Sequence, residues 1–160
     1  MTSPPTDQAS LLNDWWRRSR EAQWAHYATD RYLTRSHYAI GIPIVLLTAF
    51  SGTSVFYVMT TSPNRALGFV VATTSVVAAV LGGLQTFLHL SDQAAAHRAA
   101  AVEYSGIRRY LEEVIANYSS NGTHHDVTAL RDRFDDITKG SPAVPRRIWA
   151  RTEETLTDRT

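Results

Sequence analysis

The chain has 160 residues, a formal net charge of +1 and no cysteine. A near-zero net charge gives no electrostatic argument for binding nucleic acid, so no nucleic-acid partner is expected. The absence of cysteine excludes disulfides, thiolate metal sites and cysteine nucleophiles. This length predicts one domain.

The first 37 residues predict a flexible lead followed by a cytoplasmic helix. Two prolines lie in the lead, residues 1–9, and neither glycine nor proline occurs over residues 10–37. Side chains spaced three and four apart form a partly apolar stripe: Leu12, Trp15, Ser19, Ala22, His26, Thr29 and Leu33. Because this stripe is only partly apolar, we expect the helix to pack against a partner helix.

Two apolar runs, residues 38–59 and 66–88, contain no charged residue and no histidine. A helix rises about 1.5 Å per residue, so each run spans about 33 Å, which matches a hydrocarbon core of about 30 Å. The alternative is a buried hairpin in a soluble domain, but a soluble helix of this length normally shows a polar stripe. The short connection, residues 60–65, makes the two spans antiparallel neighbours.

Arginine placement predicts the orientation of the hairpin. Basic residues flank both spans, whereas the connecting loop contains only Arg65. The flanking arginines are Arg17, Arg18, Arg20, Arg31 and Arg35 before the first span, and Arg98, Arg108 and Arg109 after the second. Basic flanks stay on the cytoplasmic side. The sequence therefore predicts a multi-pass protein of the inner membrane with both termini in the cytoplasm and the lipid bilayer as a partner.

The second span carries a seam of small residues at alternating spacings of four and three. The seam consists of Gly68, Ala72, Ser75, Ala79, Gly82 and Thr86. Small side chains let membrane helices approach closely. Two interpretations remain open: packing against the first span, which offers Gly41, Thr48 and Gly52, or packing between the subunits of a homo-oligomer.

Three polar residues, Gln85, His89 and Asp92, mark the membrane exit at spacings of four and three. They are a candidate polar ring at the cytoplasmic mouth of an oligomeric pore. The alternative is an ordinary solvated interface.

The rhythm of four and three continues through residues 89–118, which predicts that the second span extends into a cytoplasmic coiled-coil helix. The repeating positions are Leu90, Ala94, His97, Ala101, Tyr104, Arg108, Leu111, Ile115 and Tyr118. Its expected partner is the helix over residues 10–37. Two short helices, residues 124–139 and 146–157, complete the predicted domain.

No catalytic pattern is found: there is no glycine-rich phosphate loop, no HExxH motif and no context for a Ser-His-Asp triad. We therefore expect no enzymatic activity, no cofactor and no metal. His26 and His37 share a helical face, and a pH sensor is one hypothesis, which His97 would strengthen by facing them. The alternative is a set of hydrogen-bonded histidines in a juxtamembrane bundle.

Several of these features together resemble the SLATT superfamily, whose name stands for SMODS and SLOG-associating two-transmembrane effector domain. They are the tryptophans Trp15, Trp16 and Trp24, the two-span hairpin, and the motif Ala101-Val102-Glu103-Tyr104-x-x-Ile107-Arg108-x-Tyr110-Leu111. The resemblance covers roughly residues 10–155. It implies an oligomeric, pore-forming effector of a bacterial conflict system, linked to a partner protein that makes or senses a nucleotide signal.

The sequence thus predicts an all-α membrane protein in which a two-span transmembrane hairpin extends into a cytoplasmic helical bundle. The expected function is that of a membrane effector in bacterial defence. The alternative is a non-conducting anchor or scaffold that holds a cytoplasmic partner at the membrane.

Overall fold

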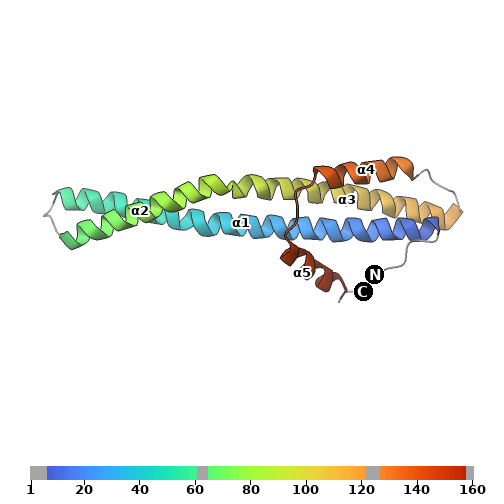
Figure 1. The fold of residues 1–160 in the computed structure, drawn as a ribbon, viewed down its shortest axis with the longest axis horizontal. Helices are drawn as coiled ribbons and strands as arrows, with labels where there is room; N and C mark the ends of the chain where they lie inside the picture. Colours follow the sequence, from blue (N-terminus) through green and yellow to red (C-terminus); the bar gives the residue numbers. More distant parts are fainter. Residues whose placement is uncertain (1–6, 61–64, 122–126, 158–160) are drawn as a thin grey trace. The chain divides into compact units, whose positions relative to one another are not determined.

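The computed structural model describes residues 7–60, 65–121 and 127–157. These residues form helices and connecting turns without any strand, which confirms the all-α prediction (Figure 1). The helices are α1 (Gln8–Thr60), α2 (Arg65–Leu88), α3 (Leu90–Asn121), α4 (Thr128–Gly140) and α5 (Arg146–Thr157). Residues 61–64 of the predicted loop and most of the predicted lead lie outside the described residues.

The chain folds into two units. The bundle unit joins the chain up to Arg31 with everything from Ala94 onward, and the hairpin unit comprises Tyr32–Gln93. Helix α1 contributes to both, because it continues without interruption through the junction and through Pro43. Its first turn is held by reciprocal hydrogen bonds, in which the Ser10 backbone N–H donates to Asp7 Oδ1 and the Asp7 N–H donates to Ser10 Oγ.

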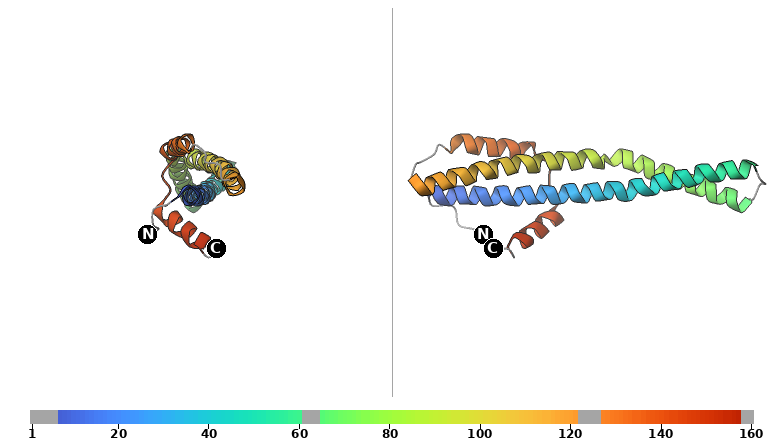
Figure 2. Two further views of the ribbon diagram at one scale, coloured as in Figure 1. Left: turned by 90° about the vertical axis from the view of Figure 1, so that its right-hand side faces the viewer. Right: turned by 180° about the vertical axis from the view of Figure 1, so that it is seen from behind.

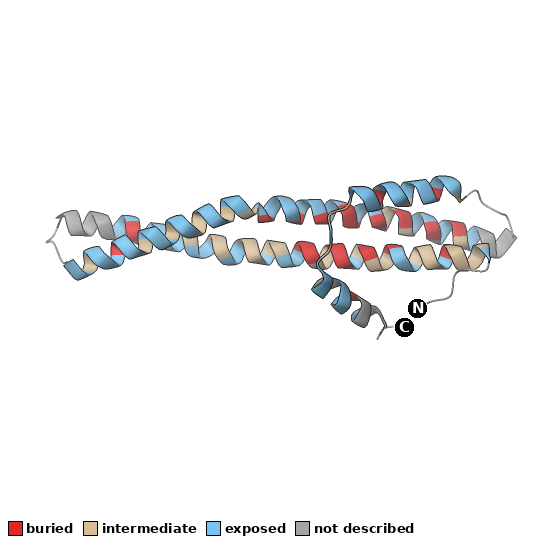
Figure 3. Ribbon diagram, in the orientation of Figure 1, coloured by how far each residue is buried: buried red, intermediate tan, exposed pale blue. Residues whose placement is uncertain are grey.

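The bundle unit has a conventional apolar core. The N-terminal part of α1 and helix α4 both lie alongside α3 (Figures 1 and 2). Buried residues, coloured red in Figure 3, recur along α1, α3 and α4 in this unit. The core consists of Leu12, Ala22, Tyr104, Ile107, Leu111, Val114, Leu130 and Ile137. Most of the predicted stripe on α3 is buried, which confirms its packing face.

Helix α3 also buries a second line of side chains, Ala100, Ile107 and Val114, beside the predicted stripe. These residues lie seven apart, as expected for one face of a helix. The second line exists because α3 packs against two helices rather than one: α4 supplies Leu130 and Ile137 to the same core. The sequence pattern predicted only the contact with α1.

The hairpin unit has the opposite surface character. Its largest apolar side chains point outward, with Phe69 and Phe87 exposed to 74% and 79%. Both α1 and α2 contain stretches long and apolar enough to cross a membrane. The apolar window of α1 has no buried residue, and that of α2 is 11% buried. A soluble core helix would bury these side chains, so the exposed apolar surface supports the membrane interpretation.

The junction between α2 and α3 departs from the predicted continuous helix. Helix α2 ends at Leu88, α3 begins at Leu90, and His89 between them has a φ of 44°. A side chain at positive φ is sterically strained, although histidine is among the residues that tolerate it. Two side chains secure the break: His89 Nδ1 donates to the Phe87 carbonyl at 2.9 Å, and Gln93 Nε2 donates to the Leu88 carbonyl at 2.9 Å.

Candidate functional site

The small-residue seam of α2 is largely exposed within the single chain. Five of its members are exposed and Gly82 is half-buried. Among the residues that the structure describes, none has an atom within 4 Å of a Cβ built at Gly68 or at Gly82. Of the residues that the first span was expected to offer, Gly41 is half-buried, whereas Thr48 and Gly52 are exposed. The seam is therefore free of intramolecular neighbours at both of these glycines.

A different line of α2 residues is turned toward the interior of the hairpin. Its members are Leu67, Val71, Thr74, Ala78, Leu81, Gln85 and Leu88, each buried or half-buried. This line repeats at the same spacings of four and three, one residue before the seam. One residue corresponds to about 100° around a helix. The helix therefore presents two distinct packing lines, and the hairpin uses the bulkier one.

The hydroxyl groups on α2 are satisfied within the helix itself. Ser75 Oγ donates to the Val71 carbonyl at 2.8 Å, and Thr86 Oγ1 donates to the Gly82 carbonyl at 3.0 Å. Thr73 and Thr74 make equivalent bonds one turn back. Because these bonds need no outside partner, the seam can face lipid or another helix without an unsatisfied donor.

The predicted polar ring at the membrane exit is not held together as a single helical face. Gln85 is half-buried and packs against Gly41, where a Cβ would lie 3.1 Å from Gln85 Nε2. His89 and Asp92 are exposed, and the positive φ of His89 interrupts the helix between Gln85 and Asp92. The structure thus places Gln85 in the hairpin contact and the other two residues on the surface.

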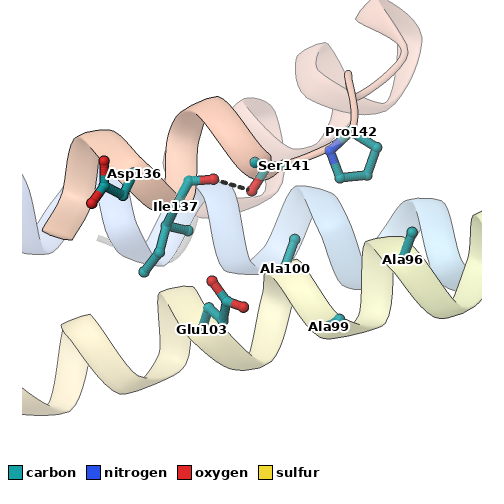
Figure 4. A pocket seen from close by; sticks show the side chains of 9 residues that line it. Ala96, Ala99, Ala100, Glu103, Asp136, Ile137, Ser141 and Pro142 are labelled. Atoms are coloured by element: carbon teal, nitrogen blue, oxygen red, sulfur yellow. Dashed lines mark hydrogen bonds between the residues drawn. The ribbon is translucent and has the colours of Figure 1, made fainter.

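Within the bundle unit, a shallow hollow of about 370 Å³ lies between α3 and the end of α4 (Figure 4). Ala96, Ala99 and Ala100 form its floor, and Glu103 and Asp136 supply carboxylates. At its far side lies Ser141, the C-cap residue of α4, whose Oγ donates to the Ile137 carbonyl at 2.7 Å. The hollow exists because alanine side chains leave space between the two helices.

Two histidines meet in the interior of the bundle unit. His26 of α1 and His97 of α3 are only 4% and 5% exposed, and their Nδ1 atoms lie 3.0 Å apart. Of the two histidines predicted to share a face, only His26 belongs to this contact. His37 lies in the hairpin unit, where its ring contacts Tyr38 edge to face.

The histidine pair is enclosed by an aromatic residue and an ion pair. Tyr104 stacks on His26 with ring centroids 5.6 Å apart, and its hydroxyl is 3.2 Å from Thr138 Oγ1 on α4. Asp30 lies one helical turn after His26 and accepts two hydrogen bonds from Arg98, at 3.1 and 3.3 Å. This set of residues, which we call the histidine cluster, links α1, α3 and α4.

Burial governs the protonation of both histidines. Desolvation and, to a smaller extent, the neighbouring His97 together lower the pKa of His26 to about 4. Desolvation also lowers the pKa of His97, while the negative charge of Asp30 partly opposes this shift. Both rings are therefore neutral near pH 7, and one Nδ1–H donates to the other Nδ1.

Asp30 and Arg98, which also belong to the cluster, were not predicted as site residues from the sequence. The available signals were the four-residue spacing of His26 and Asp30 and the seven-residue spacing of His97 and Tyr104 on α3. These spacings place each pair on one helical face. They do not say which two faces meet.

The family model described as SMODS and SLOG-associating 2TM effector domain family 4 (SLATT_4) matches residues 23–158. The match covers the hairpin unit and most of the bundle unit. No curated protein and no solved structure gives a significant match.

Proposed function

The chain belongs to the family of SMODS and SLOG-associating two-transmembrane effector domains, and on this basis we propose that it permeabilises the bacterial inner membrane after homo-oligomerisation. In this proposal the hairpin spans the bilayer, both termini lie in the cytoplasm, and the bundle unit receives a nucleotide-linked signal through a partner protein. The chain itself acts by assembly and not by catalysis.

The observation that carries the proposal is the exposed seam on α2. Lipid offers no hydrophobic drive for helix association, so membrane helices associate through close packing of small residues. Within the described part of the chain, Gly68 and Gly82 have no neighbour within 4 Å of an added Cβ, and the hairpin packs through a separate line of α2. The seam is thus available for α2 of a second copy while each hairpin stays intact.

A pore built in this way would have an apolar lining with hydroxyl groups. Neither predicted span contains a charged residue or a histidine. Without intramembrane charge, the pore is expected to discriminate weakly among ions or to gate by dewetting. On the cytoplasmic side of such a pore, His89 and Asp92 are the first charged or titratable residues that follow the second span.

The test uses purified chain in liposomes loaded with a fluorescent dye, with added candidate signalling partners and nucleotides. We expect oligomers in the membrane and dye release on activation. Ala79→Leu and Gly82→Leu should abolish both, because the larger side chains hold neighbouring helices apart. Val80→Leu is the matched control: it adds a leucine at an exposed position about 120° from the centre of the seam.

The alternative function, a non-conducting membrane scaffold, predicts a different result. Stable partner binding with the dye fully retained under every condition would favour the scaffold. Release that is unaffected by both seam substitutions would show that the seam is not the contact between subunits.

A further inference from the structure

The histidine cluster belongs to the bundle unit, whereas the seam belongs to the hairpin unit, and the proposed function gives the cluster no role. It combines two buried imidazoles, a buried carboxylate and a phenol at one level of the bundle. Buried polar groups of this kind are costly unless each is satisfied. The geometry of the cluster therefore indicates which protonation states it can hold.

The 3.0 Å contact between His26 Nδ1 and His97 Nδ1 has room for one hydrogen. In the neutral pair, one Nδ1 carries that hydrogen and the other offers its lone pair. A first added proton goes to the outer nitrogen of the donor ring, which keeps the hydrogen bond but buries a positive charge. A second added proton would place two N–H groups against each other, so the doubly charged pair cannot keep this contact.

The charged and titratable groups around the pair do not remove this conflict. Asp30 on α1 lies beside the histidine pair, and so do Arg98 and Tyr104 on α3. Helix α4 contributes two uncharged groups, the hydroxyl of Thr138 and the ring of Phe134, and both contact Tyr104. Asp30 favours a proton on His97. However, its charge is already shared with Arg98 through two hydrogen bonds.

We propose that the His26–His97 contact is a proton-released clasp, which holds α1 against α3 while both rings are neutral and opens when the surrounding solution is acidified. Opening lets water reach both imidazoles, so that each can be protonated without burying its charge. The clasp is a property of the bundle unit alone and does not depend on oligomerisation or on a pore.

Proton linkage gives the size of the expected effect. An imidazole in water titrates near pH 6.5, so at pH 5.5 solvation favours the open state by about 10-fold for each histidine that becomes protonated there. With both histidines the ratio of open to closed clasp rises about 100-fold between pH 7.5 and pH 5.5.

The experiment uses the full chain in lipid nanodiscs, with spin labels at Arg31→Cys and Val102→Cys. The natural chain has no cysteine, and both positions are exposed in the bundle unit. We expect the distance distribution between the labels to gain a longer component between pH 7.5 and pH 5.0, reversibly. His26→Gln combined with His97→Gln should remove this pH dependence, and His37→Gln is the matched control that should retain it.

A second measurement needs no histidine substitution, so it tests the proposal even if the double glutamine variant does not fold. Nitrogen NMR of histidine-labelled chain with its natural histidines should show two imidazoles that stay neutral at pH 6 and become protonated together as the longer distance appears. Distances that do not change down to pH 5.0 would overturn the proposal. Opening that persists in the folded double glutamine variant would overturn it as well.

Discussion

Gly41 of α1 and Gln85 of α2 are in direct contact inside the hairpin: a Cβ on Gly41 would lie 3.1 Å from Gln85 Nε2 and 3.6 Å from Oε1. The absence of a side chain at Gly41 thus makes room for a polar side chain within an otherwise apolar unit. Gln85 was predicted as part of a pore mouth, but in the single chain it is a packing residue of the hairpin.

The first prediction concerns this contact. Gly41→Leu should destabilise the hairpin by about 1–3 kcal/mol, because the added atoms overpack against Gln85. Adding Gln85→Ala should recover much of the loss by restoring the space, which gives a coupling that a double-mutant cycle measures. Stability is followed by denaturant titration in mixed micelles. Gly52→Leu is the control, since no atom of the described residues lies within 4 Å of a Cβ at Gly52.

The second prediction concerns the ion pair between Asp30 and Arg98, whose side chains are 6% and 63% exposed. Arg98→Ala should cost more stability than Asp30→Asn, because it leaves a carboxylate buried without its guanidinium partner. We expect about 2 kcal/mol for Arg98→Ala and about 1 kcal/mol or less for Asp30→Asn, measured by thermal unfolding. Equal losses would contradict this asymmetry.

Asp30→Asn should also change the titration of its neighbour. The carboxylate raises the pKa of His97 against the effect of burial, so its removal should lower the pKa of His97 further. Imidazole NMR of the labelled chain would measure this shift.

A further prediction is the pH dependence of stability in the bundle unit. The pKa of His26 is about 4 in the folded chain and near 6.5 when unfolded, so the unfolded chain binds more protons between these values. Stability is therefore greatest above pH 6.5, falls as the pH drops, and levels off below about 4. The full loss from His26 is about 3 kcal/mol.

Hydrogen exchange of α1 and α3 amides at pH 7 and pH 5, corrected for intrinsic rates, would measure this loss. His26→Gln should flatten the dependence, and His37→Gln should leave it in place. A bundle unit that is equally protected at both pH values would contradict the prediction.

The last prediction concerns the break between α2 and α3. His89 is held at a φ of 44°, where a β-branched residue is strongly disfavoured. His89→Val should cost about 1–2 kcal/mol or convert the break into a continuous helix. His89→Gly should be tolerated. Spin labels at Thr86→Cys and Asp92→Cys would reveal a continuous helix as a changed distance, whereas an unchanged distance with full stability would exclude strain at His89.

Much of the fold follows from the sequence because the relevant signals are local. The two charge-free runs were sufficient to predict the membrane spans, since lipid solvation depends on composition and length. The stripe on α3 predicted which face of that helix is buried. This signal is also local, because the helical period alone decides which residues share a face. The end of α4 at Gly140 and the start of α5 after Pro145 follow from local preferences, because glycine favours helix C-termini and proline is tolerated at helix N-termini.

Local signals were not sufficient for the junction and the helix pairing. The alternating spacing of four and three residues continues past His89, so periodicity predicted a continuous helix at a position where the structure has a break. On α2, two adjacent lines share the same spacing, and only the shapes of both helices decide which line packs inward. The one-residue offset between the seam and the inward line is therefore a property of the assembled hairpin.

The sequence by itself determined an all-α chain with two membrane-compatible helices and an amphipathic bundle, because composition and period are written along the chain. Only the tertiary structure decided that His26 rather than His37 meets His97, and that Asp30, Arg98 and Tyr104 surround them. The physical reason is that these contacts join residues about 70 positions apart. The register of α1 against α3 depends on how side chains of different size pack between the two helices. The spacing of residues within one helix cannot specify this register.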